Sequence, residues 1–597
     1  MMSDAPHHHR PRLGPVVWLL TAVWAIGLVI APLTGLVARS LTSVEATPIE
    51  IRDEIAHLAG AVEAARDQWE RTVDPERRAE IDRRIRLFAD RARRLADHDG
   101  APRDTVGFAN FARVDAPAMA ALWRGLAIAM AIAALSAILC YPVAWATALA
   151  LPRERGILLL VAAIAPHGLD ALLGARAWGT ILAPVIDLVG TSGVAFVALL
   201  HAQSPLMLLA LHLVLRRLDP RLIEAARDLG AAPSRIHASI VAPHALPGLA
   251  IGAAATFALT VGALATPLVV DRDRLDARLP TLVWRQIFRS DDWNLGTAHA
   301  VVLLAACLLG TIAVLRIFGV GRRHLFAPPV AGHSGSGAGA GMVPKPYLAL
   351  FLAFTLAPAV VTVAPFPVSP TGFGGPAVMA LLGDDRLGRG LLGSLVVGLA
   401  VTAVALPLGL AGALALHRRE GRGATLLFAL LVSPLLAPGL VLGLSTSILG
   451  HRLGLTGGPP LVVVAETGAV AAAAMVLFLV RLARLDPAVE QAARDLGASR
   501  GLVLRRILAP HLAPAAAVAG LVAFVLSFRD HDAAAFVVGA QRTLATVVAE
   551  RLRFGPSPAL DALGAVEVAA IVAVAALWLG QRRRLRRIDA HRRGSPV

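Results

Sequence analysis

The chain has 597 residues, of which 56% are hydrophobic and only 16% are charged, and its mean hydropathy is +0.66. This composition excludes a soluble globular domain and indicates an all-α polytopic membrane protein. The net charge of +16 does not require nucleic acid as a partner, because the arginines gather in short loops and in the C-terminal run QRRRLRRIDAHRR, where membrane lipid headgroups would meet them.

Residues 1–38 form an N-terminal tail and the first predicted transmembrane helix. The length of its apolar run and the lack of an A-x-A site favour an uncleaved anchor over a signal peptide. Residues 39–117 are polar, and apolar residues recur at helical spacing from Ile51 to Val62. We therefore expect an extracytoplasmic helical insert, a hairpin broken near Pro75.

Apolar segments of roughly 20 residues, long enough to span a bilayer, fall into two sets of about six. We expect a first membrane-spanning core at 118–320, a Gly/Ser/Pro-rich cytoplasmic linker at 321–346, a second module at 347–580 and a basic cytoplasmic tail at 581–597. The predicted spans begin near Val16, Arg124, Gly156, Gly193, Ala245 and Gly296, and then near Tyr347, Leu391, Ala424, Pro460, Ala513 and Ala559.

The arginine-rich short loops all fall on one side of this arrangement, as do the two chain ends. That side is expected to be the cytoplasm, which places both termini there.

The most informative motif is a repeat. The string DPRLIEAARDLG at 219–230 returns as DPAVEQAARDLG at 486–497, a shift of 267 residues, which indicates a duplicated and fused module. Both copies lie in polar loops, at 218–247 and 485–514, on the predicted cytoplasmic face.

Each loop has clear helix signals. Asp219 and Asp486 stand at N-cap positions before a proline, and Gly230 and Gly497 stand where a helix would end in a left-handed turn. We expect a helix, an elbow and a second short helix that stops before the next proline, Pro243 or Pro510.

One face of the first helix in each loop is apolar. A surface of this kind suits either packing against the membrane ends of the protein itself or docking of a partner. Two copies on the same predicted face favour docking. The residues concerned are Leu222, Ala226 and Leu229 in the first copy and Val489, Ala493 and Leu496 in the second.

These loops resemble the EAA loop of binding-protein-dependent ABC importer permeases: E-A-A, a glycine after three further residues, and then I-x-L-P. The second copy departs from this pattern at the acidic position, where Gln491 stands and Glu490 lies one residue earlier. The resemblance implies two tandem type I permease modules with about 12 transmembrane helices, and coupling helices that seat in ATP-binding subunits. The coupling residues that it implies are Glu224, Ala225, Ala226, Asp228 and Gly230 in the first loop and Glu490, Gln491, Ala492, Ala493, Asp495 and Gly497 in the second.

Other segments are similar to spermidine/putrescine-type permeases, namely LSF at 526–528, RFGPSPALDALGA from Arg553, ATPLVV from Ala265 and DWNLGTAHA from Asp292. Fused permeases of ferric-iron importers share the superfamily and the two-in-one layout. The resemblance therefore implies a polyamine-like or another small solute, with ferric iron, thiamine or phosphonate as alternatives.

The chain carries no ATPase motif of its own. Lys345 is its only lysine, and no G-x-x-x-x-G-K-[ST] occurs. We therefore expect a non-enzymatic permease of the bacterial inner membrane without a bound cofactor. Two separate subunits would hydrolyse ATP, and an extracytoplasmic solute-binding protein would deliver the substrate.

Ionisable groups at membrane depth are costly and usually face a cavity or a partner. They are candidates for the translocation pathway: Asp170, Arg176, Asp187, Glu466, Arg529, Asp530, His531 and Asp532. No metal site is expected, since His7, His8 and His9 lie in a polar tail and Cys140 and Cys307 lie in apolar segments as packing residues.

Two other classes of function remain. An ion-coupled secondary transporter with parallel repeats would share the two six-span halves, but it would not need paired EAA loops. A non-transporting scaffold or sensor would rest on the 39–117 insert alone.

Overall fold

The computed structural model describes residues 15–43, 48–72, 74–96, 105–271, 277–321, 345–364, 368–369, 372–373, 375–417, 419–552, 555 and 557–592. The His7–His9 tail, residues 322–344 of the expected linker and residues 593–597 of the basic tail lie outside these ranges. The side chain of Asp187 also lies outside the described part.

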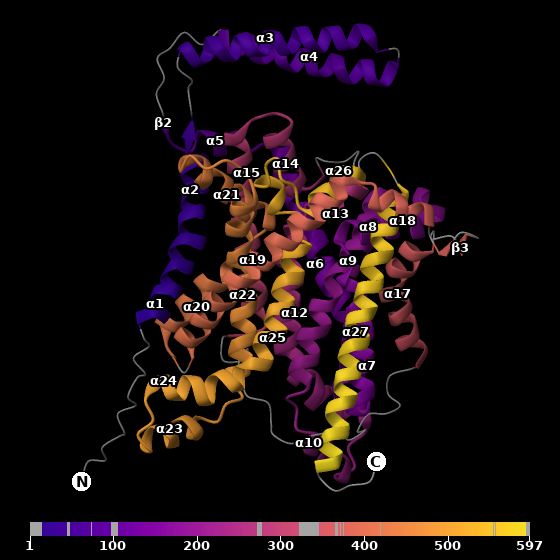
Figure 1. Ribbon diagram of the computed structural model, residues 1–597, viewed down its shortest axis with the longest axis vertical. Helices are drawn as coiled ribbons and strands as arrows, with labels where there is room; N and C mark the ends of the chain where they lie inside the picture. Colours follow the sequence, from indigo (N-terminus) through magenta and orange to yellow (C-terminus); the bar gives the residue numbers. More distant parts are fainter. Residues whose placement is uncertain are drawn as a thin grey trace.

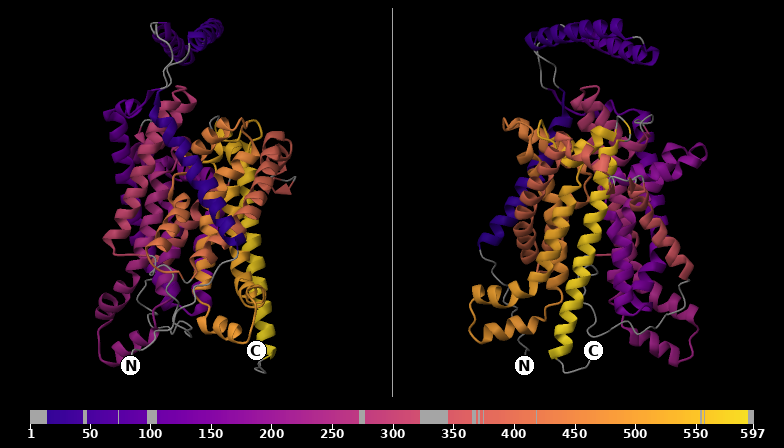
Figure 2. Two further views of the ribbon diagram at one scale, coloured as in Figure 1. Left: turned by 90° about the vertical axis from the view of Figure 1, so that its left-hand side faces the viewer. Right: turned by 45° about the vertical axis from the view of Figure 1, so that its right-hand side comes forward.

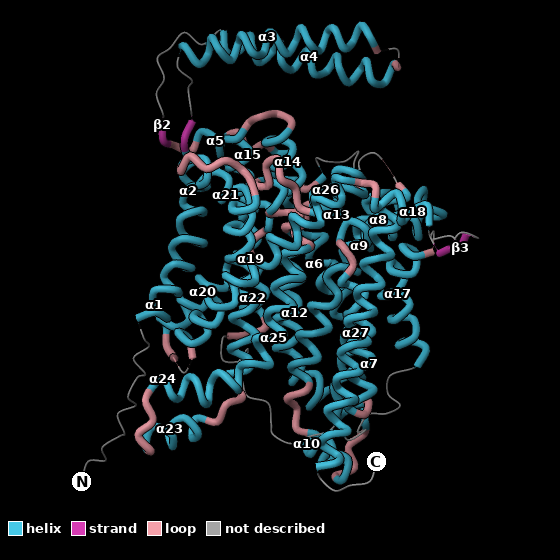
Figure 3. Tube along the Cα trace, viewed as in Figure 1, coloured by secondary structure: helices cyan, strands magenta, loops and turns pink. Residues whose placement is uncertain are grey.

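The described chain is almost entirely helical, as expected for an all-α membrane protein (Figures 1 and 3). Ten helices are long and apolar enough to cross a membrane, or up to 12 if each of two bent helix pairs forms one span. Each of the 12 predicted segments corresponds to one of these helices or pairs. Long apolar helices are predictable because every backbone hydrogen bond must be made within the segment.

The first half contains α1 (Pro15–Ala22), η1 (Val23–Ile30), α2 (Ala31–Leu41), α5 (Ala109–Ala112), α6 (Ala116–Trp145), η2 (Ala146–Ala150), α7 (Arg153–Ile164), η3 (Ala165–Gly168), α8 (Ala171–Leu182), η4 (Ala183–Val185), α9 (Ile186–Leu215), α10 (Pro220–Asp228), α11 (Pro233–Ile236), η5 (His237–Val241), α12 (Ala242–Val261), α13 (Ala265–Val270), α14 (Leu279–Phe288) and α15 (Trp293–Ile317). The second half contains α17 (Lys345–Val363), α18 (Gly375–Leu382), α19 (Asp385–Leu416), α20 (Arg422–Leu436), α21 (Gly439–Arg452), α22 (Pro459–Leu482), α23 (Pro487–Asp495), α24 (Arg500–Val503), η7 (Leu504–Leu508), α25 (Ala509–Phe528), η8 (Ala534–Phe536), α26 (Leu544–Leu552) and α27 (Pro558–Arg592).

The segment between the first two spans forms two antiparallel helices, α3 (Pro48–Arg71) and α4 (Pro75–Ala96), with the break at the predicted proline. This hairpin projects from one end of the molecule, and α10 and α23 lie at the other (Figures 1 and 2). We call these the hairpin end and the repeat-loop end. Strands β1 (Thr42–Ser43) and β2 (Thr105–Val106) pair at the base of the hairpin, and β3 (Val368–Ser369) pairs with β4 (Gly372–Phe373).

The first span of each half packs against the other half. Trp24 of η1 is fully buried in the core that α19 and α22 form, and the missing side chain of Gly412 makes room for its ring. Conversely, Phe354 of α17 packs against Trp178 of α8, and the hydroxyl of Tyr347 donates to the carbonyl oxygen of Leu139 at 2.8 Å. The halves are therefore interlocked.

The third and ninth predicted spans differ from continuous helices. The pair α7/η3 with α8/η4 bends by 97°, and α20 with α21 bends by 99°. The first bend follows Gly168, where Asp170 caps α8 by accepting from the amides of Leu172 and Leu173. The second bend lies at Ala437 and Pro438, because a proline disfavours a helical residue before it. Apolarity alone did not reveal these breaks.

The second bend is held by close packing around α21. A Cβ atom at Gly443 would lie 2.2 Å from the carbonyl oxygen of Ala533, and one at Gly262 of the first half would lie 2.7 Å from Cβ of Pro438. Glycine therefore permits the loop after α25, α21 and the first half to meet.

We predict that Gly443→Ala destabilises the protein by about 1–3 kcal/mol, the usual effect of overpacking. The measurement is the midpoint of thermal unfolding in detergent. Gly501→Ala is the matched control, because a Cβ atom there meets nothing within 4 Å. Equal midpoints for the two variants would contradict the packing argument.

Candidate functional site

The two repeat loops fold alike. Asp219 accepts from the amide of Arg221 at 3.0 Å, and Asp486 accepts from the amide of Ala488 at 2.9 Å, so the predicted N-caps are confirmed. Each following proline occupies the first turn, where a missing N–H leaves no hydrogen bond unmade.

Both helices end in the same left-handed turn. Gly230 has φ +75° and Gly497 has φ +79°, values that a residue with a Cβ atom adopts only with strain. The amide of Gly230 donates to Arg227, and that of Ala231 donates to Ala226; the second loop repeats both bonds. This is the Schellman arrangement, and the predicted C-terminal glycines are confirmed.

The expected end of the second short helix is wrong. From Pro233 the chain continues without a stop to Val261, and in the second loop it continues from Gly501 to Phe528. A π-helical turn, η5 or η7, precedes Pro243 and Pro510. Its i→i+5 bonds, such as Ala242 N–H to His237 O, shift the hydrogen-bond register so that the proline is accommodated.

Each loop helix presents large apolar side chains to solvent beside charged ones. Leu229 is 87% exposed and Leu496 is 88% exposed, and Leu222 and Val489 are also exposed. Ala226 and Ala493 are half-buried. These leucines therefore do not pack against the membrane ends of the chain. Most of the proposed coupling residues share this exposure: Glu224, Ala225, Asp228, Gly230, Gln491, Ala492, Asp495 and Gly497.

Glu490 differs from the other acidic residues, because it faces inward and is only 5% exposed. Its carboxylate lies 3.5 Å from His417 at the end of α19 and 3.7 Å from Arg494. The 267-residue shift aligns it with Ile223, which is buried against apolar residues. Gln491 is thus the exposed counterpart of Glu224, and Glu490 helps to hold α23 in place.

Two histidines that the sequence prediction missed attach the loops to the spans before them. The imidazole of His244 donates to the carbonyl oxygen of Val214 at 3.2 Å, and that of His511 donates to Arg481 at 2.9 Å. Both pairs obey the 267-residue shift. The recurring string A-P-H was the available signal.

The chain segments just before the two repeat loops lie close enough for their charges to interact. Burial, together with the positive charge of Arg484, lowers the pKa of Arg217 below its ordinary value. Since these two arginines are themselves related by the 267-residue shift, the starts of both loops lie near the boundary between the halves.

The candidate pathway residues gather at that boundary, nearer the hairpin end. Asp170 donates its amide to Glu567 of α27 at 2.9 Å, and Arg529 donates to the carbonyl oxygen of His167 at 2.5 Å. Arg176 pairs with Asp561 at 2.7 Å. Each of these bonds joins one half to the other.

The loop after α25 completes the contact. Asp532 accepts from the amides of Leu264 and Ala265 at 3.1 and 2.9 Å, at the start of α13 in the first half. His531 lies 3.3 Å from the same carboxylate, and Asp530 accepts from the amide of Ala533 at 3.3 Å.

Glu466 is buried and accepts from the hydroxyl of Ser527 through Oε2. Its Oε1 has no hydrogen-bond partner among the described residues.

The described residues contain no group of three His, Cys, Asp or Glu placed to hold a metal ion. Cys140 and Cys307 are buried and donate to carbonyl oxygens at 3.3 and 3.2 Å, respectively.

Comparisons with known proteins identify inner-membrane transport components that are similar to this chain. Residues 135–320 match the family model "Binding-protein-dependent transport system inner membrane component". The putrescine transport system permease protein PotI of Escherichia coli K12 is 31% identical over 227 residues, which cover 36% of this chain and 81% of PotI. The spermidine/putrescine transport system permease protein PotC is 27% identical over 202 residues, 34% of this chain and 76% of PotC. The inner membrane ABC transporter permease protein YdcU of Escherichia coli K12 is 30% identical over 174 residues. This match covers 25% of the present chain and 56% of YdcU, so the chain spans about half the length of that relative.

We expect Asp532→Ala to destabilise the contact between the halves by about 1–3 kcal/mol, because two buried amides lose their acceptor. Thermal unfolding of the purified chain measures the effect. Asp532→Asn keeps one acceptor oxygen and should show a smaller shift. An Ala variant as stable as wild type would disprove this role for the carboxylate.

Proposed function

The chain belongs to the inner-membrane permease components of binding-protein-dependent ABC importers, and we propose that it combines both permease halves of one importer in a single polypeptide. In this proposal two separate ATP-binding subunits dock on α10 and α23, and a solute-binding protein delivers substrate at the hairpin end. The proposal rests above all on the two capped helices that present Leu229 and Leu496 to solvent at one end of the molecule.

The charge distribution supports this orientation. The short arginine-rich segments PRER at 152–155 and HRREGR at 417–422 join η2 to α7 and α19 to α20. The helices before them, α6 with η2 and α19, run from the hairpin end to the repeat-loop end (Figure 1). Short arginine-rich loops favour the cytoplasm. The start of α1 and the end of α27 lie toward the same end, consistent with cytoplasmic termini.

The geometry also suggests how ATP binding would move the pathway. Each loop helix leads, through its elbow and π-helical turn, into a long span. The segment that follows each span contacts the other half: Gly262 after α12 approaches Pro438, and Asp532 after α25 accepts from the amides of Leu264 and Ala265. A displacement of α10 or α23 is therefore transmitted along α12 or α25. Alternating access would follow from two states of this boundary that the ATP-binding subunits favour differently.

The solute that we propose is a small cation of the polyamine type. The printed names of PotI and PotC concern putrescine and spermidine, and the polar cluster here brings together the carboxyl groups of Asp170, Glu466, Asp530, Asp532 and Glu567. Carboxyl oxygens accept hydrogen bonds from ammonium groups, which favours a polyamine over an anionic phosphonate.

We predict that the double variant Leu229→Glu with Leu496→Glu lowers solute uptake at least about tenfold, since charges replace the central apolar contacts of two docking surfaces. Uptake and co-purification of an ATP-binding subunit are measured on membranes with equal amounts of the chain. Leu453→Glu, at an exposed leucine after α21, is the control. Full uptake in the double variant would refute the coupling role, and uptake without any ATPase would identify a secondary transporter.

For the solute, we expect that Glu466→Gln combined with Asp530→Asn lowers putrescine or spermidine uptake at least about tenfold, equivalent to about 1.4 kcal/mol. Co-purification of the ATP-binding subunit should be unchanged, because the substituted groups lie away from the loops. Transport of ferric iron, thiamine or a phosphonate by wild type, without polyamine transport, would overturn the solute assignment.

A further inference from the structure

A cleft of about 610 Å³ opens at the hairpin end of the second half. It lies between the start of α19, the turn before α26 and the start of α22. The segment before α26 lies directly on α19, because Gly393 has no side chain where a Cβ atom would come within 2.7 Å of the carbonyl oxygen of Arg542. Ser394 fixes the same segment by accepting from the amide of Leu544 at 2.9 Å.

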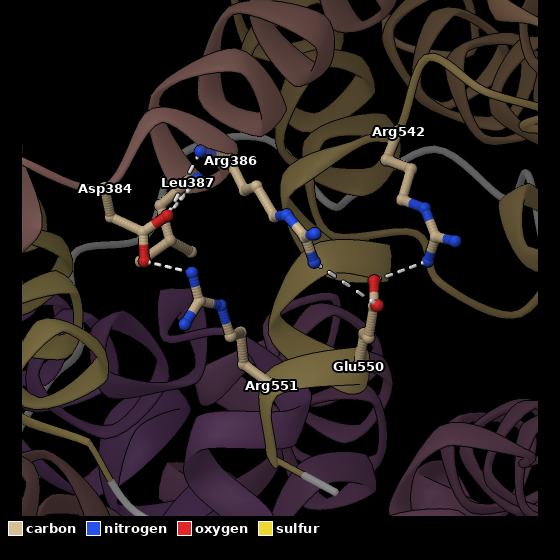
Figure 4. Close-up of polar contacts among 6 residues, drawn as sticks. All are labelled: Asp384, Arg386, Leu387, Arg542, Glu550 and Arg551. Carbon is tan, nitrogen blue, oxygen red and sulfur yellow. Dashed lines mark hydrogen bonds and ion pairs between the residues drawn. The ribbon is translucent and has the colours of Figure 1, made fainter. Parts of the chain in front are cut away.

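The rim of the cleft carries three arginines, Arg386, Arg389 and Arg542, and one carboxylate, Glu550. Glu550 accepts from Arg542 at 2.6 Å and lies 3.9 Å from Arg386; Figure 4 shows the two guanidinium groups converging on it. No ion pair joins Arg389 to a described residue. The rim thus has two positive charges more than it has negative charges.

A second cleft of about 430 Å³ adjoins the first and shares Arg386 and Arg389, and it is also lined by the carboxylates of Asp384 and Asp385. There Arg551 pairs with Asp384, the N-cap of α19. Because this carboxylate already accepts from Arg551 and from two backbone amides, it is occupied by contacts within the chain.

The fold of this edge does not require these arginines. In the first half, Asp115 caps α6 as Asp384 caps α19, and LPTLV in α14 corresponds to LATVV in α26. When the helices are aligned on these features, the positions of Arg386, Arg389 and Arg542 hold Pro117, Ala120 and Ala277. These three arginines therefore have no arginine counterparts at the same positions of the first half, where Arg124 of α6 instead donates to the carbonyl oxygen of Ala277 at 3.3 Å.

Below the rim, the cleft is apolar and continues onto a membrane-spanning helix. Leu392 and Val396 line the cleft and are 63% and 62% exposed, and Leu399, one turn further, is also exposed. These residues share one face of α19. Arg386 and Arg389 lie in the first two turns of the span, at the level where arginine side chains meet lipid headgroups.

We propose that this cleft binds an anionic phospholipid, with the phosphate among Arg386, Arg389 and Arg542 and an acyl chain along Leu392, Val396 and Leu399. A positively charged rim directly above an apolar helix face matches the headgroup and the acyl chain of one lipid molecule. A soluble acidic partner would contact the rim but would leave the face of Leu392, Val396 and Leu399 uncovered. The lipid site rests on the proposed function in one respect only: the orientation in that proposal places the cleft in the extracytoplasmic leaflet.

The test is native mass spectrometry of the full chain in detergent, titrated separately with phosphatidylglycerol and phosphatidylcholine. We expect one phosphatidylglycerol to bind with a clear preference over phosphatidylcholine. The triple variant Arg386→Gln, Arg389→Gln and Arg542→Gln should weaken this binding about 100-fold, since three basic groups each contribute a separate electrostatic attraction. The single variant Arg389→Gln, which breaks no ion pair with a described residue, should weaken it about fivefold.

The control is Arg124→Gln with Arg289→Gln, two exposed arginines of the first half. Its binding should equal that of wild type. The proposal fails if phosphatidylcholine binds equally well, if the control loses the lipid as the triple variant does, or if Arg389→Gln has no effect. It also fails if inorganic phosphate displaces the lipid at similar concentration, which would identify a site for a free anion. None of these measurements requires an ATP-binding subunit, so failure of coupling leaves them unaffected.

Discussion

The structure depends on a requirement that every polar group at the boundary between the halves find its partner inside the protein, because lipid offers none. Two bent helix pairs expose backbone groups at membrane depth, and side chains of the opposite half approach them. Arg529 donates to the carbonyl oxygen of His167, and Glu567 accepts from the amide of Asp170. Irregular backbone is stable there only as long as the halves remain together.

This requirement also explains why the first spans are exchanged. Trp24 and its neighbours bury themselves in the second half, and α17 lies along the first half. Neither half therefore has a complete core by itself. When the halves move relative to each other, a limited set of polar contacts and glycine-mediated close approaches must change. The two exchanged helices keep the halves attached to each other.

Duplication produced two similar halves, but they have diverged in chemistry. The two loop helices have the same caps and the same exposed leucines, yet Ile223 holds one of them by apolar contact, whereas Glu490 holds the other through His417 and Arg494. At the hairpin end, arginines occupy the second half where alanine and proline occupy the first. The shared backbone presents the same capped helix in both halves, while the differences give each half its own surface.

The sequence by itself determined the 12 apolar segments, the duplicated loops, their caps and the family, because hydropathy and capping are local properties. It did not reveal the bends near Asp170 and Pro438, the uninterrupted helices through Pro243 and Pro510, or the inward orientation of Glu490. Only the tertiary structure decided which polar groups meet: the backbone amide of Asp170 and the carboxylate of Glu567, which it contacts, are 397 residues apart. The physical reason is that such contacts depend on how whole helices pack, and no spacing along the chain encodes that.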